Sequence, residues 1–220
     1  MASYDMYVRL TLDSEELDPP ETLWIRGAVR AVDDAALGAQ DVKVDDDGLE
    51  WNGPDGIRKW RLILIEGNRA LLYGHHVFDS HTLNHKPAID LLADCPKWLP
   101  VQRLRSLMDE TGIGFVYWWV NGAWRYSDYP GEFVDDGLYG GVQDVTSDQF
   151  IVDYGSQDRG RLTAFLERAK RRDVDEAAVE ALFSGSDRAD VAAALACARR
   201  AGLVVGSVLP YRPVPRRRPR

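Results

Sequence analysis

Long apolar runs and cysteines are both scarce in this chain of 220 residues. No apolar run approaches the roughly 20 residues that a membrane-spanning helix requires, so the sequence predicts no transmembrane segment. The two cysteines, Cys95 and Cys197, lie far apart, which suits a reducing compartment and not a disulfide scaffold. The N-terminus lacks the basic and apolar segments of a secretory signal. We therefore expect a cytoplasmic protein that does not bind membranes.

The common motifs of catalysis are also missing. The chain contains no GxxxxGK[ST] loop, no strand-linked GxGxxG, no GxSxG elbow, no HExxH and no CxxC. These absences remove the direct signals for nucleotide binding, serine hydrolysis, zinc peptidase chemistry and dithiol chemistry. Whether the protein is an enzyme stays open, and the sequence favours a non-enzymatic role.

The composition is that of an ordinary globular protein with an acidic surplus. Hydrophobic residues make up 45% of the chain, and 27 Lys+Arg stand against 35 Asp+Glu for a net charge of −8. A chain of this length can bury a core without a structural metal or disulfides. The negative net charge argues against a general nucleic-acid binder.

The first 156 residues contain several hairpin patterns. Residues 4–12 alternate apolar and polar side chains, which predicts a half-buried strand. Asp47-Gly48 suits the turn of a hairpin. The apolar runs 57–65 and 69–77 predict a second hairpin. Successive hairpins of this kind build an antiparallel sheet.

A third hairpin carries the strongest turn signal. Asn121-Gly122 is a preferred pair for two-residue turns and sets the register of strands at 113–120 and 123–129. This register places Trp119 opposite Trp124. Because side chains alternate between faces, one face of the hairpin is predicted to hold Tyr117, Trp119, Trp124 and Tyr126, with Trp118 on the other.

Helices are predicted between and before these strands. Residues 23–32 fit either a strand or a short helix, since Gly27 weakens a helix. A short helix is predicted at 88–94. A longer one is predicted from Pro100, a residue suited to the first helical position, to Gly112, which can end a helix.

The character of the chain changes toward its C-terminus. Short strands are predicted near 141–145 and 150–154. From 158 to 202 the apolar spacing predicts three helices. The tail from 206 is rich in proline and arginine, which predicts a disordered or extended segment.

Strands thus come first and helices follow, which indicates an α+β fold. We expect an antiparallel sheet built from hairpins, with helices on one side and a C-terminal helical segment. The predicted division is an α+β hairpin-rich domain at 1–156, a helical segment at 157–205 and a disordered Pro/Arg tail at 206–220. The helical segment is either an appendage or a cover for the sheet.

The leading functional hypothesis rests on the aromatic hairpin. Seven tryptophans are many for this length, and Trp and Tyr anchor protein interfaces. The same face could instead pack as core under the helices, and the sequence favours this arrangement for most of it because cross-strand aromatic pairs commonly stabilise sheets. The sequence favours a non-enzymatic cytoplasmic module that binds a protein partner, in an immunity-like, antitoxin-like or regulatory role. The candidate anchors are Trp118, Trp119, Trp124 and Tyr126.

A histidine cluster supports an alternative. All four histidines fall within eleven residues, in GHHVFDSHTLNH, and imidazole and carboxylate are ligands for zinc and similar metals. A metal-dependent hydrolase or nuclease using zinc or another divalent metal would take its ligands from His75, His76, Asp79, His81 and His85.

The hairpin, the loop and the following helix resemble the ββα metal-finger nucleases through His76, Asn84 and His85. In that family the catalytic histidine ends the first strand, whereas here the histidines end the second. No roles are therefore carried over.

A third hypothesis is a DNA-associated regulator that uses residues 173–220. Two helices joined by Ser184-Gly185-Ser186 have helix-turn-helix spacing, and the arginine-rich tail could contact phosphates. The last helix offers few basic residues for reading a groove. The third hypothesis therefore depends mainly on the tail, which contains Arg212, Arg216, Arg217, Arg218 and Arg220.

Overall fold

The computed structural model describes residues 17–53, 56–130, 135–154 and 157–214. The strand predicted over 4–12 lies outside these residues. None of the helices in the described part combines the length and the apolarity that crossing a bilayer requires.

In the described part of the chain, six antiparallel strands form one sheet in the order β1-β2-β3-β4-β5-β6, so each strand pairs with its neighbour in sequence. The strands are β1 (Val42–Asp45), β2 (Gly48–Asn52), β3 (Arg58–Ile65), β4 (Arg69–His76), β5 (Phe115–Val120) and β6 (Ala123–Arg125). The α+β class, the antiparallel sheet and the C-terminal helical segment are confirmed.

All three predicted hairpins are present. Asn121 and Gly122 have φ of 54° and 80°, the conformation that a two-residue hairpin turn of this type requires. Trp119 pairs with Trp124, as the turn predicts. Local turn chemistry is therefore enough to set the register of this hairpin.

The helices are α1 (Pro20–Leu37), α2 (Val101–Thr111), α3 (Leu138–Val142), α4 (Asp148–Tyr154), α5 (Arg159–Arg171), α6 (Glu176–Leu182) and α7 (Val191–Arg200), with 3-10 turns at His81–Asn84 and Gln143–Val145. The ambiguous 23–32 segment is helical. A Cβ on Gly27 would lie 2.3 Å from Leu49 Cδ2, so this glycine lets α1 approach the sheet and does not end the helix.

Three predicted elements are wrong. Residues 88–90 are irregular and 91–94 form a turn, because the Asp90 carboxylate accepts a hydrogen bond from the Leu92 amide (3.1 Å), a local contact that competes with a helix. Residues near 141–145 and 150–154 are helical and not strands. At the start of the helix that contains 150–154, the Ser147 hydroxyl accepts a hydrogen bond from the Phe150 amide (3.0 Å), which favours helix initiation at this point.

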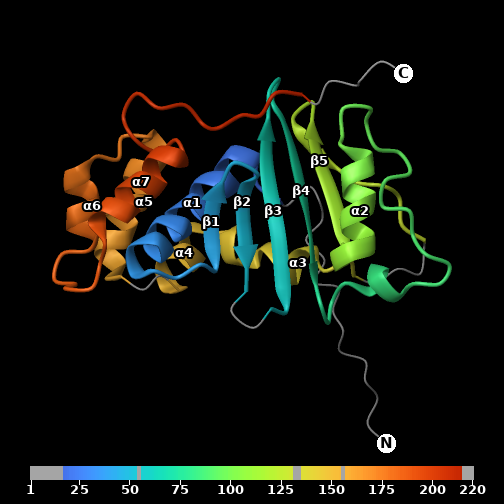
Figure 1. Ribbon diagram of the computed structural model, residues 1–220, viewed down its shortest axis with the longest axis horizontal. Helices are drawn as coiled ribbons and strands as arrows, with labels where there is room; N and C mark the ends of the chain where they lie inside the picture. Colours follow the sequence, from blue (N-terminus) through green and yellow to red (C-terminus); the bar gives the residue numbers. More distant parts are fainter. Residues whose placement is uncertain (1–16, 54–55, 131–134, 155–156, 215–220) are drawn as a thin grey trace, which may run out of the picture.

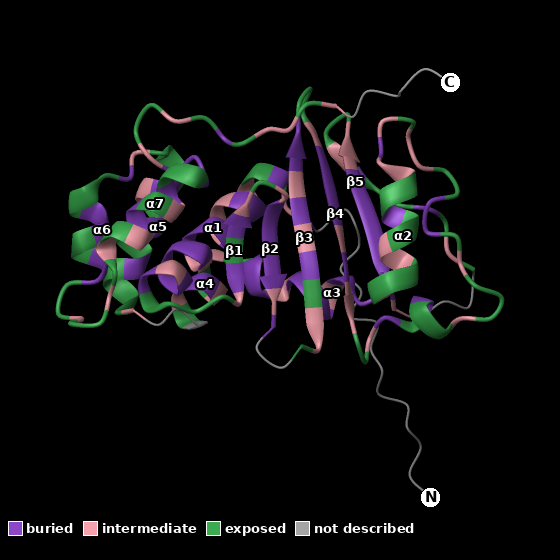
Figure 2. Ribbon diagram, viewed as in Figure 1, coloured by how far each residue is buried: buried purple, intermediate pink, exposed green. Residues whose placement is uncertain are grey.

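The sheet separates two hydrophobic cores. The larger core lies on the face toward α1 and includes Leu62, Leu72 and Phe115. The smaller core lies on the opposite face, where Leu104 of α2 packs with Trp118. Figure 1 shows α2 alongside β5, at the far end of the molecule from α5, α6 and α7. Figure 2 shows the alternation of buried and more exposed residues as bands along β3.

The C-terminal helices join the larger core through α1. The Trp24 indole donates a hydrogen bond to the Ala201 carbonyl (3.0 Å). After α7 the chain returns to the sheet, where the Arg212 amide bonds to the Leu64 carbonyl (2.9 Å) and the Glu66 amide bonds to the Arg212 carbonyl (2.8 Å). This part of the predicted tail is extended, and residues 215–220 lie outside the described part.

Candidate functional site

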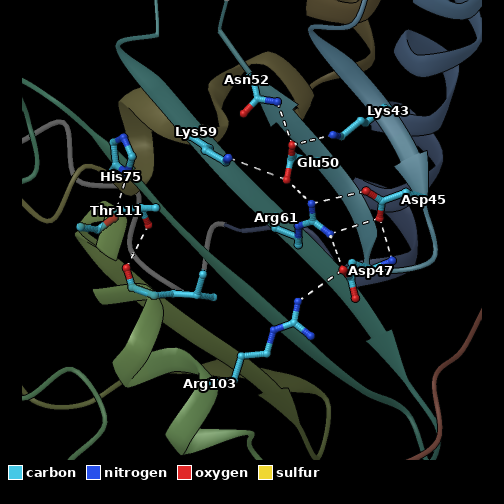
Figure 3. A network of polar contacts seen from close by, with 12 residues as sticks. Lys43, Asp45, Asp47, Glu50, Asn52, Lys59, Arg61, His75, Arg103 and Thr111 are labelled. Carbon is cyan, nitrogen blue, oxygen red and sulfur yellow. Dashed lines mark hydrogen bonds and ion pairs between the residues drawn. The ribbon is translucent and has the colours of Figure 1, made fainter. Parts of the chain in front are cut away.

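One half of the sheet face opposite α1 is polar. Leu49 of β2 and Leu62 of β3 point toward α1, whereas charged residues stand at alternate positions of the same strands, at Glu50, Lys59 and Arg61. α2 covers β4 and β5 on this face through the smaller core. The polar side chains over β1, β2 and β3 are Lys43, Asp45, Glu50, Asn52, Lys59 and Arg61, shown in Figure 3.

Glu50 is the centre of this polar network. It is 5% exposed and contacts the Arg61 guanidinium. It accepts a hydrogen bond from the Asn52 amide group (2.9 Å) and pairs with Lys43 (3.1 Å). Burial by itself raises the pKa of Glu50, but the hydrogen bonds from Arg61 and Asn52 outweigh it and lower the pKa to about 2. Glu50 is therefore ionised throughout the physiological range.

Asp47, in the turn between β1 and β2, links three arginines from distant segments. Its carboxylate lies 3.3 Å from Arg103 of α2, 3.1 Å from Arg212 of the returning chain and 3.9 Å from Arg61 of β3. Burial tends to raise the pKa of Asp47, and the charges of Arg103, Arg212 and Arg61 lower it below its usual range. Figure 3 shows the Arg103–Asp47 pair reaching from α2 to the β1–β2 turn.

Two hollows lie along α2, and we call them together the α2 groove. The polar hollow, of about 130 Å³, is lined by residues that include Lys59, His75 and Thr111. The apolar hollow, of about 360 Å³, is lined by residues that include Ile63, Ile65, Leu71 and Leu104. Tyr73, Arg103 and Leu107 line both hollows. The groove thus offers charged and apolar contacts side by side.

The predicted aromatic anchors are placed differently from one another. Trp118 is 4% exposed in the smaller core, and Trp124 is 3% exposed in the larger one. Trp119 is partly buried against the larger core, and Tyr126 is 38% exposed. Burial favours a packing role for Trp118 and Trp124. Trp119 and Tyr126 are the more accessible of the four side chains, and their contact with a partner stays a prediction.

The histidine cluster is spread over both faces of the sheet. His75 lies in the α2 groove, where its Nδ1 is 3.1 Å from the Gly112 carbonyl and burial lowers its pKa. His76 points to the other face and pairs with Asp79 (2.9 Å). His81 and His85 follow in the next turn, His85 with its Nδ1 2.7 Å from the Pro87 carbonyl.

Within the described ranges, no three His, Cys, Asp or Glu side chains come together in a group that could hold a metal ion. The structure thus pairs His76 with Asp79 but does not assemble the predicted set. Metal binding stays a prediction.

The C-terminal helices place their basic residues apart. Arg200 donates to the Val44 carbonyl at the edge of the sheet (3.3 Å), while Arg188 and Arg199 are exposed. Ala194 and Ala198 of α7 are buried against the core. DNA contact through this segment stays a prediction.

Comparisons with protein-family models, with curated proteins and with solved structures give no match to this chain. The sequence missed the α2 groove because its charged residues come from four separate segments. The available signal was the alternation of charge along residues 59–61 opposite an apolar face.

Proposed function

We propose that the protein is a non-enzymatic binding module that contacts a protein partner through the α2 groove. The observation that carries the proposal is the open polar half of the sheet beside α2, where side chains are held by ion pairs and not covered by another helix of the described chain. An immunity-like, antitoxin-like or regulatory role is a form of this proposal, and the partner's identity would decide between them.

The protonation states in the groove favour binding over acid–base chemistry. A general acid or base works best with a pKa near the operating pH. Glu50 has a pKa of about 2, and the pKa of Asp47 is below its ordinary value. Both carboxylates are therefore held as fixed charges by arginines, which suits recognition and not proton transfer.

Ion pairs across the groove also reduce the cost of binding. Arg61 is held by Asp45 (3.1 Å) and by Glu50, so its orientation is set before a partner arrives. Side chains that are already ordered lose less conformational entropy on association. Complementary charges add specificity and a faster encounter.

Site-specific crosslinking tests this proposal in the native host. A photo-crosslinking amino acid is placed at Lys59 or Thr111, which lie in the groove. The matched control is Glu180, which is exposed on α6. We expect one discrete crosslinked partner from both groove positions and none from position 180.

The crosslinked partner is then purified, and its affinity is measured for the wild type and for Lys59→Glu. A loss of at least tenfold supports the groove as the contact surface. Equal crosslinking at position 180, or none at the groove positions, would contradict the proposal.

A further inference from the structure

Three arginines reach the same carboxylate from three parts of the chain. Arg61 comes from β3, Arg103 from the first turn of α2, and Arg212 from the strand-like segment that pairs with the end of β3. All three lie within 4 Å of the Asp47 carboxylate. Arginines bind carboxylates through charge-assisted hydrogen bonds, so this corner of the α2 groove is a carboxylate-binding site that the chain fills with its own side chain.

The carboxylate that fills it sits on an exposed turn. Asp47 lies in the two-residue loop of the β1–β2 hairpin, with 44% of its side chain exposed. Exposed ion pairs of this kind contribute little net stability, about 0 to 1 kcal/mol. A carboxylate from another molecule can therefore replace Asp47 without disturbing the fold.

The apolar hollow adjoins the same arginines. Arg103 and Arg212 both line it, and its floor is formed by aliphatic side chains of β3, β4 and α2. A volume of about 360 Å³ accommodates one or two apolar side chains of a partner. A ligand that fits both features carries a carboxylate next to an apolar side chain.

The charge balance of the groove favours an acidic partner. Among the described residues, four cations and two carboxylates line the groove, although the whole chain has a net charge of −8. These groups are Lys59, Arg61, Arg103 and Arg212 against Asp47 and Glu50. The groove thus carries the opposite sign to the protein as a whole, which selects for an acidic segment and against a basic one.

We infer that the α2 groove binds an acidic segment of a partner protein in which a carboxylate lies beside an apolar side chain, and that Asp47 occupies the carboxylate position in the free protein. This inference rests on the proposed function and names the chemistry of its partner. The partner carboxylate displaces Asp47 from Arg103 and Arg212, and the apolar side chain enters the hollow between them.

Peptide selection tests the partner chemistry without knowledge of the partner. A phage library of random 12-residue peptides is selected on the wild-type protein, with counter-selection on the double variant Arg103→Gln/Arg212→Gln. The expected enrichment is Asp or Glu next to Leu, Ile, Phe or Met. No enrichment, or enrichment without acidic residues, overturns the inference.

The affinity of one enriched peptide then tests the role of Arg103 and Arg212. We expect the double variant to bind it at least tenfold more weakly, and a peptide with Gln in place of Glu to show a similar loss. Arg105→Gln is the matched control on α2, since Arg105 pairs with Asp90 (3.0 Å) outside the groove. Thermal melting verifies that every variant is folded.

Asp47→Asn is expected to bind the peptide at least threefold more tightly, because the internal competitor is removed. Asp46→Asn removes the same charge from the same turn, and no ion pair of Asp46 is seen in the described structure. Asp46→Asn should change the affinity for the peptide by less than half as much as Asp47→Asn does. Equal effects of the two changes, or weaker binding by Asp47→Asn, overturn the displacement of Asp47.

The proposed function and the inferred partner chemistry can be rejected independently of each other. If crosslinking from Lys59 and Thr111 succeeds while acidic peptides are not selected, the groove is the contact surface and the partner chemistry is wrong. If both fail, the proposed function fails with it.

Discussion

The two faces of the sheet are built from the same strands and differ in what covers them. The face toward α1 is largely apolar and closed by the larger core, with one ion pair between Arg58 of β3 and the buried Asp144 (2.8 Å). The opposite face is apolar under α2, over β4, β5 and the end of β3 that contains Ile63 and Ile65, and carries the ion-pair network over β1, β2 and the rest of β3. The first face accounts for the fold, and the second holds the candidate site.

The energetic contribution of the two faces differs as well. Burial of apolar area stabilises a fold by roughly 25 cal/mol per Å², whereas buried ion pairs often add nothing beyond what apolar residues would contribute. Apolar residues could therefore replace the network of Glu50, Arg61 and their neighbours as a whole, although removing one partner alone destabilises the fold by leaving the other charge unpaired. This is why we assign the polar half of the sheet to recognition and not to folding.

The largest predicted effect is at Trp124 on the covered face. Trp124 is 3% exposed, and its indole donates to the Asp18 carbonyl (2.9 Å). Trp124→Ala should lower the free energy of unfolding by about 4 kcal/mol, measured by urea denaturation. Tyr126→Ala, at the exposed end of the same hairpin, should cost less than about 1.5 kcal/mol. Similar small losses at both positions would contradict the packing role of Trp124.

A second pair of substitutions compares adjacent residues of β3 whose side chains point to opposite faces of the sheet. Leu62 is fully buried in the larger core, and Ile63 lines the apolar hollow of the groove. Leu62→Ala should cost about 3 kcal/mol. Ile63→Ala should cost about 1 kcal/mol, because its side chain is only partly buried. Denaturant midpoints of the two variants test this difference, and the reverse order would refute it.

Glu50 gives the polar face a pH dependence. Its folded pKa of about 2 lies below the ordinary 4.5, so its stabilising effect is complete above about pH 4.5 and is lost as the pH falls toward 2. Glu50→Gln should lower the unfolding free energy by about 2 kcal/mol at pH 7. The difference from the wild type should shrink between pH 5 and pH 2.5. A difference that does not change with pH would show that the Glu50 charge is not what matters.

The smallest predicted effect is at the groove rim. Asp47→Asn should change the unfolding free energy by less than about 1 kcal/mol, because its ion pairs are exposed. Differential scanning calorimetry, with Asp46→Asn as the control, measures this change. A loss of several kcal/mol would mean that Asp47 holds the fold together, and that a partner could not replace it.

Much of the fold could be predicted from local patterns. The turn at Asn121-Gly122 and the alternation along residues 57–65 specify strands and register without tertiary information. The strand prediction for residues 141–145 is wrong because a segment of five residues with two valines is too short to distinguish period two from period 3.6. Its helix is decided by contacts of Leu138 and Val142 with the core.

The candidate site could not be predicted in the same way. Asp47, Arg103 and Arg212 are separated by more than fifty residues in each step, and only the folded chain brings them to one carboxylate. The tryptophans do not identify the site either, because a large aromatic side chain is typical of both cores and interfaces. Burial, which distinguishes the two, depends on where α1 and α2 pack.

The most direct test of the central claim compares the two candidate surfaces in one experiment. The photo-crosslinking amino acid is placed at Lys59 in the α2 groove or at Tyr126 on the aromatic hairpin, and the yield of the same crosslinked partner is measured. Our account predicts a yield several-fold higher from position 59 than from position 126. A higher yield from position 126 would contradict it and would return the binding site to the hairpin.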